Sequence, residues 1–549
     1  MNILVLMGDQ HRWDALGCAA EGLEPWQRTW LMDGPGGAPL ARTPHLDRLA
    51  ATGVRFSQAV ANLPVCVPCR HSFITGMYPH QIGILSNAHY WPFDPPVPTL
   101  GQRLKDAGYA TAAVGKMHWK NRSAPDEHVP DKRGFDFRAG RGGITDGPLD
   151  VSLSDGVQSG EARRRADQTA RFGVGGESRE GYVGDVSSQP ASELPETWLV
   201  DQAVDYLRRH HRAQQAQPAP GALRGEQAPG ASAGPQDAGG GAVDAQPFCL
   251  LVSLDRPHPP NVIPSDFAGL VRPEDVPLPP AVPPGFHEDD PHVRRQIEQR
   301  GWGQMDEPEL RTSIARYLIN VSYVDDCLGK VLTALDELGY AENTLVVLLS
   351  DHGELLGERR QPGHGGAHTK YSLYDSAVRV PLIVRWPGVS RPGVVSHAAV
   401  ELIDLMPTWL DAARAAAPPY LPGRSLRPLL EGQTPQQAGW RQATLSEQFT
   451  AAIDTLIETP TEAPGNSGLP DGAAPTPRGQ WAVREQRYKL IHRAGARSAF
   501  YDLQQDPGEL ENLIDDSSLA TIRERLYAHL AQGVISRAEQ FPAQWQPVV

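Results

Sequence analysis

Short runs of apolar residues, rich in Val, Ile and Leu, recur along the chain. They cover residues 3–7, 248–254, 344–349 and 381–384, and residues 109–114 form a weaker example. The runs are too short for helices and show no regular alternation with polar residues. This pattern is typical of strands covered on both faces, and it predicts a largely parallel sheet.

Between these runs the apolar residues follow helical spacing. Thr43-Pro44 supplies a cap and a first-turn proline for a helix that ends at Gly53, and Thr99 opens a second helix that ends at Gly108. The longest helical pattern covers residues 309–338 and stops before Gly339. Strands that alternate with helices predict a doubly wound α/β sheet.

Three polar segments interrupt this pattern. Residues 214–246 are almost entirely Ala, Gly, Pro, Gln and Asp, a composition that cannot form a packed core, so we expect a disordered insert. Residues 152–192 and 458–479 are expected to form long surface segments. We expect a main α/β domain over residues 1–435, which contains the insert, and a C-terminal subdomain over residues 436–549.

The net charge and the number of cysteines limit the partners and cellular compartments that we expect for this protein. The formal net charge of -14, without a long Lys/Arg run, disfavours nucleic acid and anionic membranes as partners, so an anionic substrate would need local cations. Five scattered cysteines do not form a disulfide framework and favour a reducing compartment. The N-terminal apolar run lacks the flanks of a signal peptide, and no apolar run approaches the roughly 20 residues of a membrane span, so we expect a cytoplasmic protein.

Polar residues follow the C-terminal ends of four predicted strands. They are Asp9 with Gln10, Lys116 with His118, His258, and Asp351 with His352. Ligands of open α/β sheets bind at the carboxyl ends of the strands, so these side chains are expected to converge on one site.

Asp9, Gln10, Asp351 and His352 offer three oxygen-bearing side chains and one imidazole. Such a set suits a hard or borderline divalent cation, and Ca²⁺ is preferred here over Mn²⁺ and Mg²⁺. The alternative is that the two aspartates only cap the following helices.

Cationic side chains are available to bind an anion beside this metal. Lys116, His118, His258, Lys370 and Arg70 would supply donors for a tetrahedral oxyanion, and histidine can also transfer a proton near neutral pH. His80, His364 and His368 are left out of this set, because solvated surface positions explain them equally well.

The sequence PVCVPCRHSFITG at residues 64–76 places Cys66 and Cys69 three residues apart. A redox pair would need a thioredoxin-like context, and a zinc knuckle would need a second Cys or His pair that the sequence lacks. A buried pair of thiols is a third interpretation. None of these explains Pro68, Arg70 and the Thr75-Gly76 ending together.

Residues 66–76 resemble the CxPxR signature of the sulfatase family, whose first Cys is oxidised after synthesis to formylglycine. The similarity extends over nearly the whole chain. It includes the first strand with Asp9-Gln10, GKMH at residues 115–118, RGFD at 133–136, PHP at 257–259, SDHGE at 350–354, KYSLYDSAVRVP at 370–381, and FYDL, DPGE and NL between residues 500 and 513.

This resemblance implies an alkaline-phosphatase-like fold, with a large, mixed, mostly parallel sheet flanked by helices and a smaller C-terminal α+β subdomain. It also implies a metal site of Asp9, Gln10, Asp351, His352 and the modified Cys66, whose hydrated aldehyde attacks sulfur or phosphorus. Arg70 and Lys116 would hold this diol, His118 would deprotonate it to expel sulfate, and His258 and Lys370 would bind the oxyanion. A formylglycine-generating enzyme is then a required partner.

Two positions depart from the common family pattern. Cys69 stands where Ser or Ala is usual, and Gln10 stands where many members carry Asp. The chain is also similar to phosphonate monoester hydrolases and choline-sulfatase-like enzymes. The first hypothesis is therefore a sulfatase acting on a small sulfate ester. The alternatives are a hydrolase of phosphonate monoesters or phosphodiesters on the same scaffold and a non-catalytic anion-binding or thiol-sensing protein. The sequence leaves open whether the chain forms a homo-oligomer.

Overall fold

The computed structural model describes residues 1–32, 34–87, 97–119, 133–140, 149–152, 178–216, 246–449 and 479–534. Most of the predicted insert at 214–246, much of the segment at 152–192 and almost all of the segment at 458–479 lie outside the described residues. Residues 214 and 215 belong to a helix.

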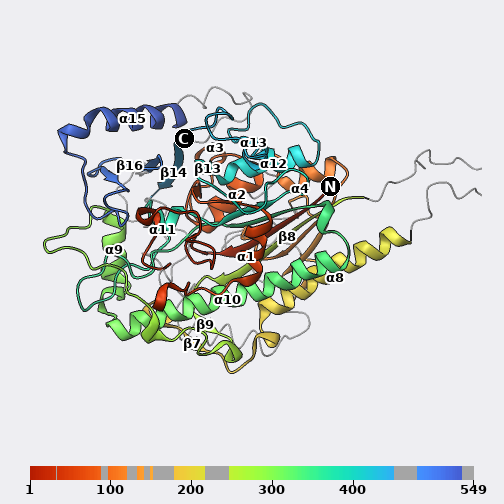
Figure 1. The fold of residues 1–549 in the computed structure, drawn as a ribbon, viewed down its shortest axis with the longest axis horizontal. Helices are drawn as coiled ribbons and strands as arrows, with labels where there is room; N and C mark the ends of the chain where they lie inside the picture. Colours follow the sequence, from red (N-terminus) through yellow and green to blue (C-terminus); the bar gives the residue numbers. More distant parts are fainter. Residues whose placement is uncertain are drawn as a thin grey trace, which may run out of the picture.

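A nine-stranded sheet forms the centre of the described structure (Figure 1). Its spatial order is β12 (Val394–Ser396), β2 (Val54–Phe56), β11 (Leu382–Arg385), β10 (Thr344–Ser350), β1 (Asn2–Asp9), β8 (Phe248–Pro257), β4 (Ala110–Gly115), β5 (Phe137–Gly140) and β6 (Val151–Ser152). The strands from β10 to β6 are mutually parallel, whereas β11 is antiparallel to both of its neighbours. The five apolar runs therefore are strands, and the predicted, mostly parallel sheet is confirmed.

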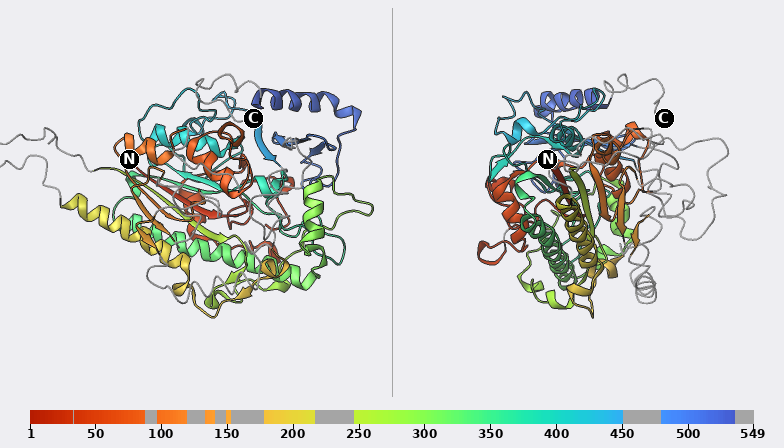
Figure 2. Two further views of the ribbon diagram at one scale, coloured as in Figure 1. Left: turned by 180° about the vertical axis from the view of Figure 1, so that it is seen from behind. Right: turned by 90° about the vertical axis from the view of Figure 1, so that its right-hand side faces the viewer.

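Successive side chains of the central strands enter two separate cores. Leu4 and Leu6 of β1 pack with α1 (Pro44–Thr52), α8 (Pro195–Gln215) and α10 (Glu307–Glu337). Val5 and Met7 point the other way and pack with α2 (Cys66–Thr75), α4 (Leu100–Asp106) and α12 (Leu405–Ala412). Because both faces are covered by helices, as Figures 1 and 2 show, the central strands are mostly apolar on both faces.

The helices at Thr43, Thr99 and residues 309–338 correspond to α1, α4 and α10, so these three predictions are confirmed. Helix α8, which is 21 residues long and lies alongside α10, was not predicted from the sequence. The shorter elements are α3 (Pro79–Ile82), α7 (Arg179–Val183), α9 (Pro291–Gln299), α11 (Asp375–Val378), α13 (Arg427–Leu430), β3 (Ala59–Val60), β13 (Val400–Glu401), β7 (Asp185–Val186) and β9 (Val262–Ile263).

The C-terminal part has its own antiparallel sheet. The strands β14 (Thr444–Phe449), β15 (Gly479–Arg484), β16 (Tyr488–Arg493) and β17 (Ala499–Asp502) pair in chain order, and α15 (Ala520–Val534) packs on one face (Figure 1). This arrangement is the smaller α+β subdomain that was expected. None of the described helices is both apolar enough and long enough to span a bilayer.

Candidate active site

The predicted convergence of strand-end residues occurs at one edge of the sheet. β10, β1, β8 and β4 are consecutive parallel neighbours, so their carboxyl ends lie side by side. Asp9 ends β1, and Asp351, His258 and Lys116 each directly follow one of the other three strands. The side chains of Asp9 and Asp351 are completely buried.

Cys66 is the first residue of α2, and its side chain lies at the centre of this site. Its Sγ lies 3.1 Å from His352 Nε2, 3.5 Å from Lys370 Nζ and 3.7 Å from Asp9 Oδ1. Only 1% of Cys66 is exposed. Burial, followed by the charge of Asp9, raises the pKa of the thiol to about 12, so an unmodified Cys66 stays protonated near neutral pH.

Arg70, one turn further along α2, donates hydrogen bonds to the carboxylates of both Asp9 and Asp351. Its Nε donates to Asp351 Oδ2 at 2.8 Å, and one Nη donates to Asp9 Oδ2 at 3.0 Å. Lys116 Nζ lies 2.6 Å from the same Asp9 oxygen. Burial alone would raise the pKa of Asp9, but the nearby cations, with Lys116 first, hold it well below its usual value. Asp9 is therefore kept ionised.

His352 has the orientation expected of a metal ligand. Its Nδ1 lies 3.0 Å from the carbonyl oxygen of Gly353, and since a carbonyl can only accept, Nδ1 carries the hydrogen. Nε2 then presents a lone pair toward Cys66, 3.8 Å from Oδ1 of both Asp9 and Asp351. The four candidate ligand atoms of Asp9, Cys66, Asp351 and His352 lie within 4.8 Å of one another.

Gln10 completes the oxygen-rich side of the site. Its φ of 64° lies in the left-handed region, which non-glycine residues rarely occupy and which is enriched at functional sites. Its Oε1 accepts from Lys370 Nζ at 3.3 Å, and its Nε2 donates to the hydroxyl of Tyr182 at 3.4 Å. The amide oxygen is thereby directed toward the cationic side of the site.

Lys370 and His258 form a hydrogen-bonded pair beside Cys66. Lys370 Nζ lies 2.8 Å from His258 Nε2, while Nδ1 of the same ring donates to the carbonyl of Pro259 at 2.7 Å. Nε2 therefore accepts from the lysine. Lys370 can donate to an anion, whereas His258 can donate through Nε2 only when its ring carries a second proton.

His118 lies at the same strand end as Lys116, but the described residues give it no hydrogen bond to Cys66. It has a φ of 55°, and its Nδ1 is buried without a hydrogen-bond partner in the described part of the chain. Burial and the adjacent Lys116 hold the pKa of this imidazole well below its usual value, so it is neutral and able to accept a proton.

The three histidines omitted from the predicted set lie in other surroundings. His80 pairs with Glu447 at 2.7 Å, and His364 is exposed. His368 is fully buried and packs against Tyr182, with ring centroids 4.7 Å apart, so the solvated position considered for it is wrong. Neither Asp9 nor Asp351 is the N-cap of a described helix, so the capping interpretation is wrong.

Cys69 belongs to the apolar core on which α2 packs and is not among the four candidate metal ligands. The CxxC spacing therefore places only its first thiol in the site. Two further residues escaped the sequence analysis. Ser253, which accepts from Arg70 at 2.9 Å, is a polar residue inside an apolar run and could have been noticed. Tyr182 lies in a polar segment that gives no such signal.

A family model described as sulfatase matches residues 1–214 and 241–415, and one described as N-sulphoglucosamine sulphohydrolase, C-terminal, matches residues 474–535. The chain is 28% identical to a multifunctional alkaline phosphatase superfamily protein, PehA, of Trinickia caryophylli, over 95% of this chain and 92% of that protein. It is 26% identical to a choline-sulfatase of Rhizobium meliloti, over 90% and 83% of the two chains.

Among solved structures, the phosphonate monoester hydrolase of Silicibacter pomeroyi superposes with a TM-score of 0.67 at 23% identity, covering 98% of this chain and 95% of that one. This likeness confirms the alkaline-phosphatase-like fold. The sulfatase model spans most of the sheet and its strand-end residues. The chain belongs to the sulfatase family of sulfuric ester hydrolases.

Proposed function

We propose that this protein hydrolyses small sulfate esters with a formylglycine produced from Cys66 and with a divalent cation. The observation that carries the proposal is the position of Cys66 Sγ, which lies within 3.7 Å of a carboxylate, an imidazole and an ammonium group. A buried thiol with a raised pKa is a poor nucleophile there, whereas the hydrated aldehyde of formylglycine would supply an oxygen nucleophile.

The donor set fits a divalent cation. The outer oxygens of Asp9 and Asp351 are engaged by Arg70, which leaves their Oδ1 atoms near Nε2 of His352. Gln10 would add its amide oxygen. The bound cation would polarise an ester oxygen and favour ionisation of the nucleophile. Mostly oxygen ligands favour Ca²⁺, with Mn²⁺ and Mg²⁺ as the other candidates.

The other candidate residues would hold the nucleophile, bind the oxyanion and transfer a proton. Arg70 and Lys116, both held by Asp9, would fix the nucleophile at position 66. Lys370 would donate to the sulfuryl oxygens, and His258 in its doubly protonated form would donate through Nε2 to the departing oxygen. His118, kept neutral, would accept the proton whose removal releases sulfate.

The direct test combines peptide mass spectrometry with a substrate comparison, using protein made with a formylglycine-generating enzyme. We expect sulfur and two hydrogens at position 66 to be replaced by one oxygen, and we expect turnover of 4-nitrophenyl sulfate. An unmodified Cys66, or no turnover of any ester by fully modified protein, would contradict the proposal and favour an anion-binding or thiol-sensing role.

A second candidate is hydrolysis of phosphonate monoesters or phosphodiesters at the same site. Gln10 leaves the ligand set less anionic than an aspartate would, which suits any of these monoanionic esters. The similarity to the multifunctional protein PehA supports the second candidate. The values of kcat/KM on matched 4-nitrophenyl sulfate, phenylphosphonate and phosphodiester substrates decide between the two, since their ratio reports differential transition-state stabilisation.

Replacing Lys370 by methionine is expected to lower kcat/KM for 4-nitrophenyl sulfate by about 10²–10³-fold, the usual effect of removing one oxyanion donor. Methionine retains the length and apolar stem of the side chain. Lys105→Met, an exposed lysine of α4, serves as the matched control and should retain full activity. Equal activity of the two variants would exclude Lys370 from oxyanion binding.

The protonation of His118 is expected to determine how hydrolysis decreases at acidic pH. Its lowered pKa means that the neutral imidazole persists below the ordinary histidine value of about 6.5. Activity that depends on this base should therefore fall only as the pH drops through the lowered pKa, on the acid side of 6.5. In His118→Ala, kcat should fall by about 10²-fold or more. An unchanged kcat and an unchanged acid limb in that variant would exclude the role.

A further inference from the structure

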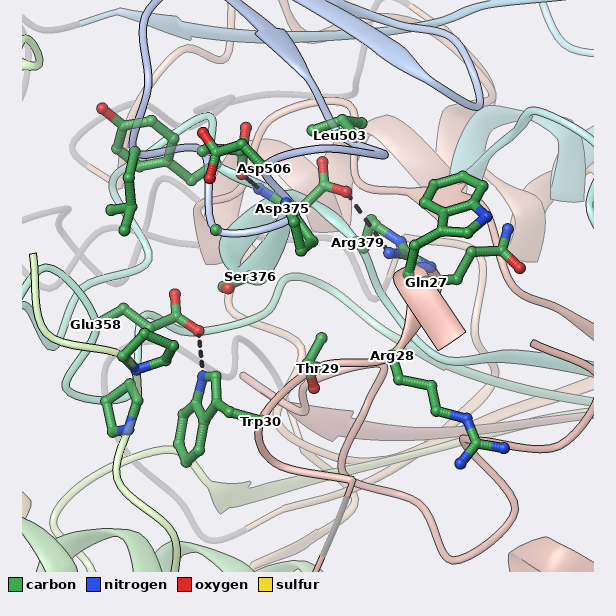
Figure 3. Close-up of a pocket in the computed structure, with 18 of the residues that line it drawn as sticks. Gln27, Arg28, Thr29, Trp30, Glu358, Asp375, Ser376, Arg379, Leu503 and Asp506 are labelled. Carbon is green, nitrogen blue, oxygen red and sulfur yellow. Dashed lines mark hydrogen bonds and ion pairs between the residues drawn. The ribbon is translucent and has the colours of Figure 1, made fainter. Parts of the chain in front are cut away.

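A second cavity, of about 280 Å³, lies away from the active site, where three distant parts of the chain meet. One wall comes from residues 26–30, which begin within η1 (Pro25–Gln27), and another from residues 374–379 around α11. The third comes from residues 503–510, which follow β17 (Figure 3). None of the candidate active-site residues lines this cavity.

A cluster of charges with excess positive character forms one side of this cavity. The carboxylate of Asp375 is shared by Arg484 at 2.8 Å, Lys489 at 2.8 Å and Arg379 at 3.5 Å. Glu509 lies 2.7 Å from Lys489 and is the only other carboxylate that the ion pairs of the described residues give this lysine. These ion pairs join three cations to two carboxylates, of which Lys489 alone does not line the cavity, and Asp14 adds a further negative charge that acts on Arg379. Incomplete charge pairing is costly in such a buried place.

Arg379 is the least neutralised member of this cluster. It is only 5% exposed, and its Nε has no hydrogen-bond partner in the described part of the chain. One Nη donates to the carbonyl of Ser57, and the guanidinium lies 3.3 Å from the centroid of the Trp13 ring. Burial, followed by repulsion from Arg484, lowers the pKa of this guanidinium to about 9. An anion would relieve both the repulsion and the missing hydrogen bond.

The acidic residues elsewhere on the lining are already occupied. Glu358 accepts from Trp30 Nε1 at 3.1 Å and from Arg12 at 3.0 Å, and Asp506 accepts from the backbone of Glu511. Figure 3 shows the Glu358–Trp30 pair and the Asp375–Arg379 pair on different sides of the cavity, with Thr29 and Ser376 between them. These acids therefore do not compensate Arg379.

Polar residues on the lining include Arg28, Arg359 and Gln58, and the remaining part is aromatic or apolar. It is formed by Trp13, Trp26, Trp30, Tyr374, Leu503, Leu510 and prolines 279, 280 and 507. A volume near the lower end of the roughly 300–1,000 Å³ of small-molecule sites, with mostly apolar walls and a few polar anchors, is typical of a ligand pocket.

We propose that this cavity binds a small organic anion, a monocarboxylate with a flat apolar body whose carboxylate accepts hydrogen bonds from Arg379. The ring of such a ligand would lie among the tryptophan side chains. The two oxygens of a carboxylate have the spacing and planarity needed to accept hydrogen bonds from a planar guanidinium. The proposal does not depend on the chemistry at Cys66, so either can fail without the other.

The probe is 4-iodobenzoate, soaked into crystals of the full-length protein, because anomalous scattering from iodine locates it without ambiguity. We expect iodine between Trp30 and Arg379, and a dissociation constant in calorimetry below about 1 mM. The uncharged amide 4-iodobenzamide has nearly the same shape and should bind at least about tenfold more weakly, since it cannot form the charge-assisted hydrogen bond.

Two variants complete the test. Arg379→Met should weaken binding of 4-iodobenzoate by about tenfold or more, and Ser376→Trp should abolish it by filling the cavity without removing a charge. A thermal melt and the circular dichroism spectrum report whether Ser376→Trp is folded, so this control does not depend on hydrolysis. Iodine only at the active site, no binding at millimolar concentration, or equal affinity for the acid and the amide would each overturn the proposal.

Discussion

Replacing Cys66 by alanine is expected to abolish ester hydrolysis, with a fall in kcat of about 10⁴-fold or more, while the protein remains folded. The fall is large because the nucleophile would be lost, and knockouts of catalytic nucleophiles have effects of this order or greater. Folding should persist because alanine favours the helical conformation at the start of α2 and the site keeps its ion pairs. Steady-state kinetics and a thermal melt measure the two effects.

Cys69→Ala is the matched control for this variant. Cys69 lies three residues further along the same helix but packs in the apolar core, and alanine is a usual residue at this place in the family. The control should therefore retain the modification and the activity. If Cys66→Ala retained wild-type activity, or if both variants lost activity equally, Cys66 would not be the source of the nucleophile.

Removal of divalent cations is expected to have the second large effect on activity. Loss of the cation should lower kcat/KM by about 10³-fold or more, since metal-assisted charge stabilisation supplies several kcal/mol and each 1.36 kcal/mol is a factor of ten. The protein should stay folded, because Arg70 and Lys116 still pair with the aspartates. Its melting temperature should fall, since a cation that binds only the folded state stabilises that state.

The experiment uses dialysis against a chelator, elemental analysis, and then separate addition of Ca²⁺, Mn²⁺ and Mg²⁺. Chelator saturated with Ca²⁺ beforehand controls for effects of the chelator itself. Recovery by one cation, in activity and in melting temperature together, identifies the metal. Undiminished kcat/KM in protein shown to be free of metal would rule out the proposed metal site.

Local sequence patterns predicted much of the fold. The central strands could be located because helices cover both faces of the sheet, so each strand is a continuous apolar run. The helices α1, α4 and α10 were predictable from caps, a first-turn proline and terminal glycines. Helix α8 was missed, although it begins with a proline and has a buried apolar face, because a long polar segment precedes it in the chain.

The candidate site was predictable to a lesser degree. Residues directly after buried strands could be grouped in advance, because parallel strands end at a common edge. Tyr182 could not be assigned to the site in advance. It contacts Gln10 from a segment whose polar composition is that of an ordinary surface loop. The cavity beside Arg379 was also beyond prediction, since its walls come from residues 26–30, 374–379 and 503–510.

The sequence by itself therefore determined the elements, the family motifs and the candidate chemistry, because these depend on residues that are close together in the chain. Only the tertiary structure decided that β10, β1, β8 and β4 are neighbours, which brings Asp351, Asp9, His258 and Lys116 around Cys66. It also decided that Arg70 joins two carboxylates and that Arg379 is left with an incomplete partner set. Distances and burial between remote residues arise from packing, which local sequence patterns do not encode.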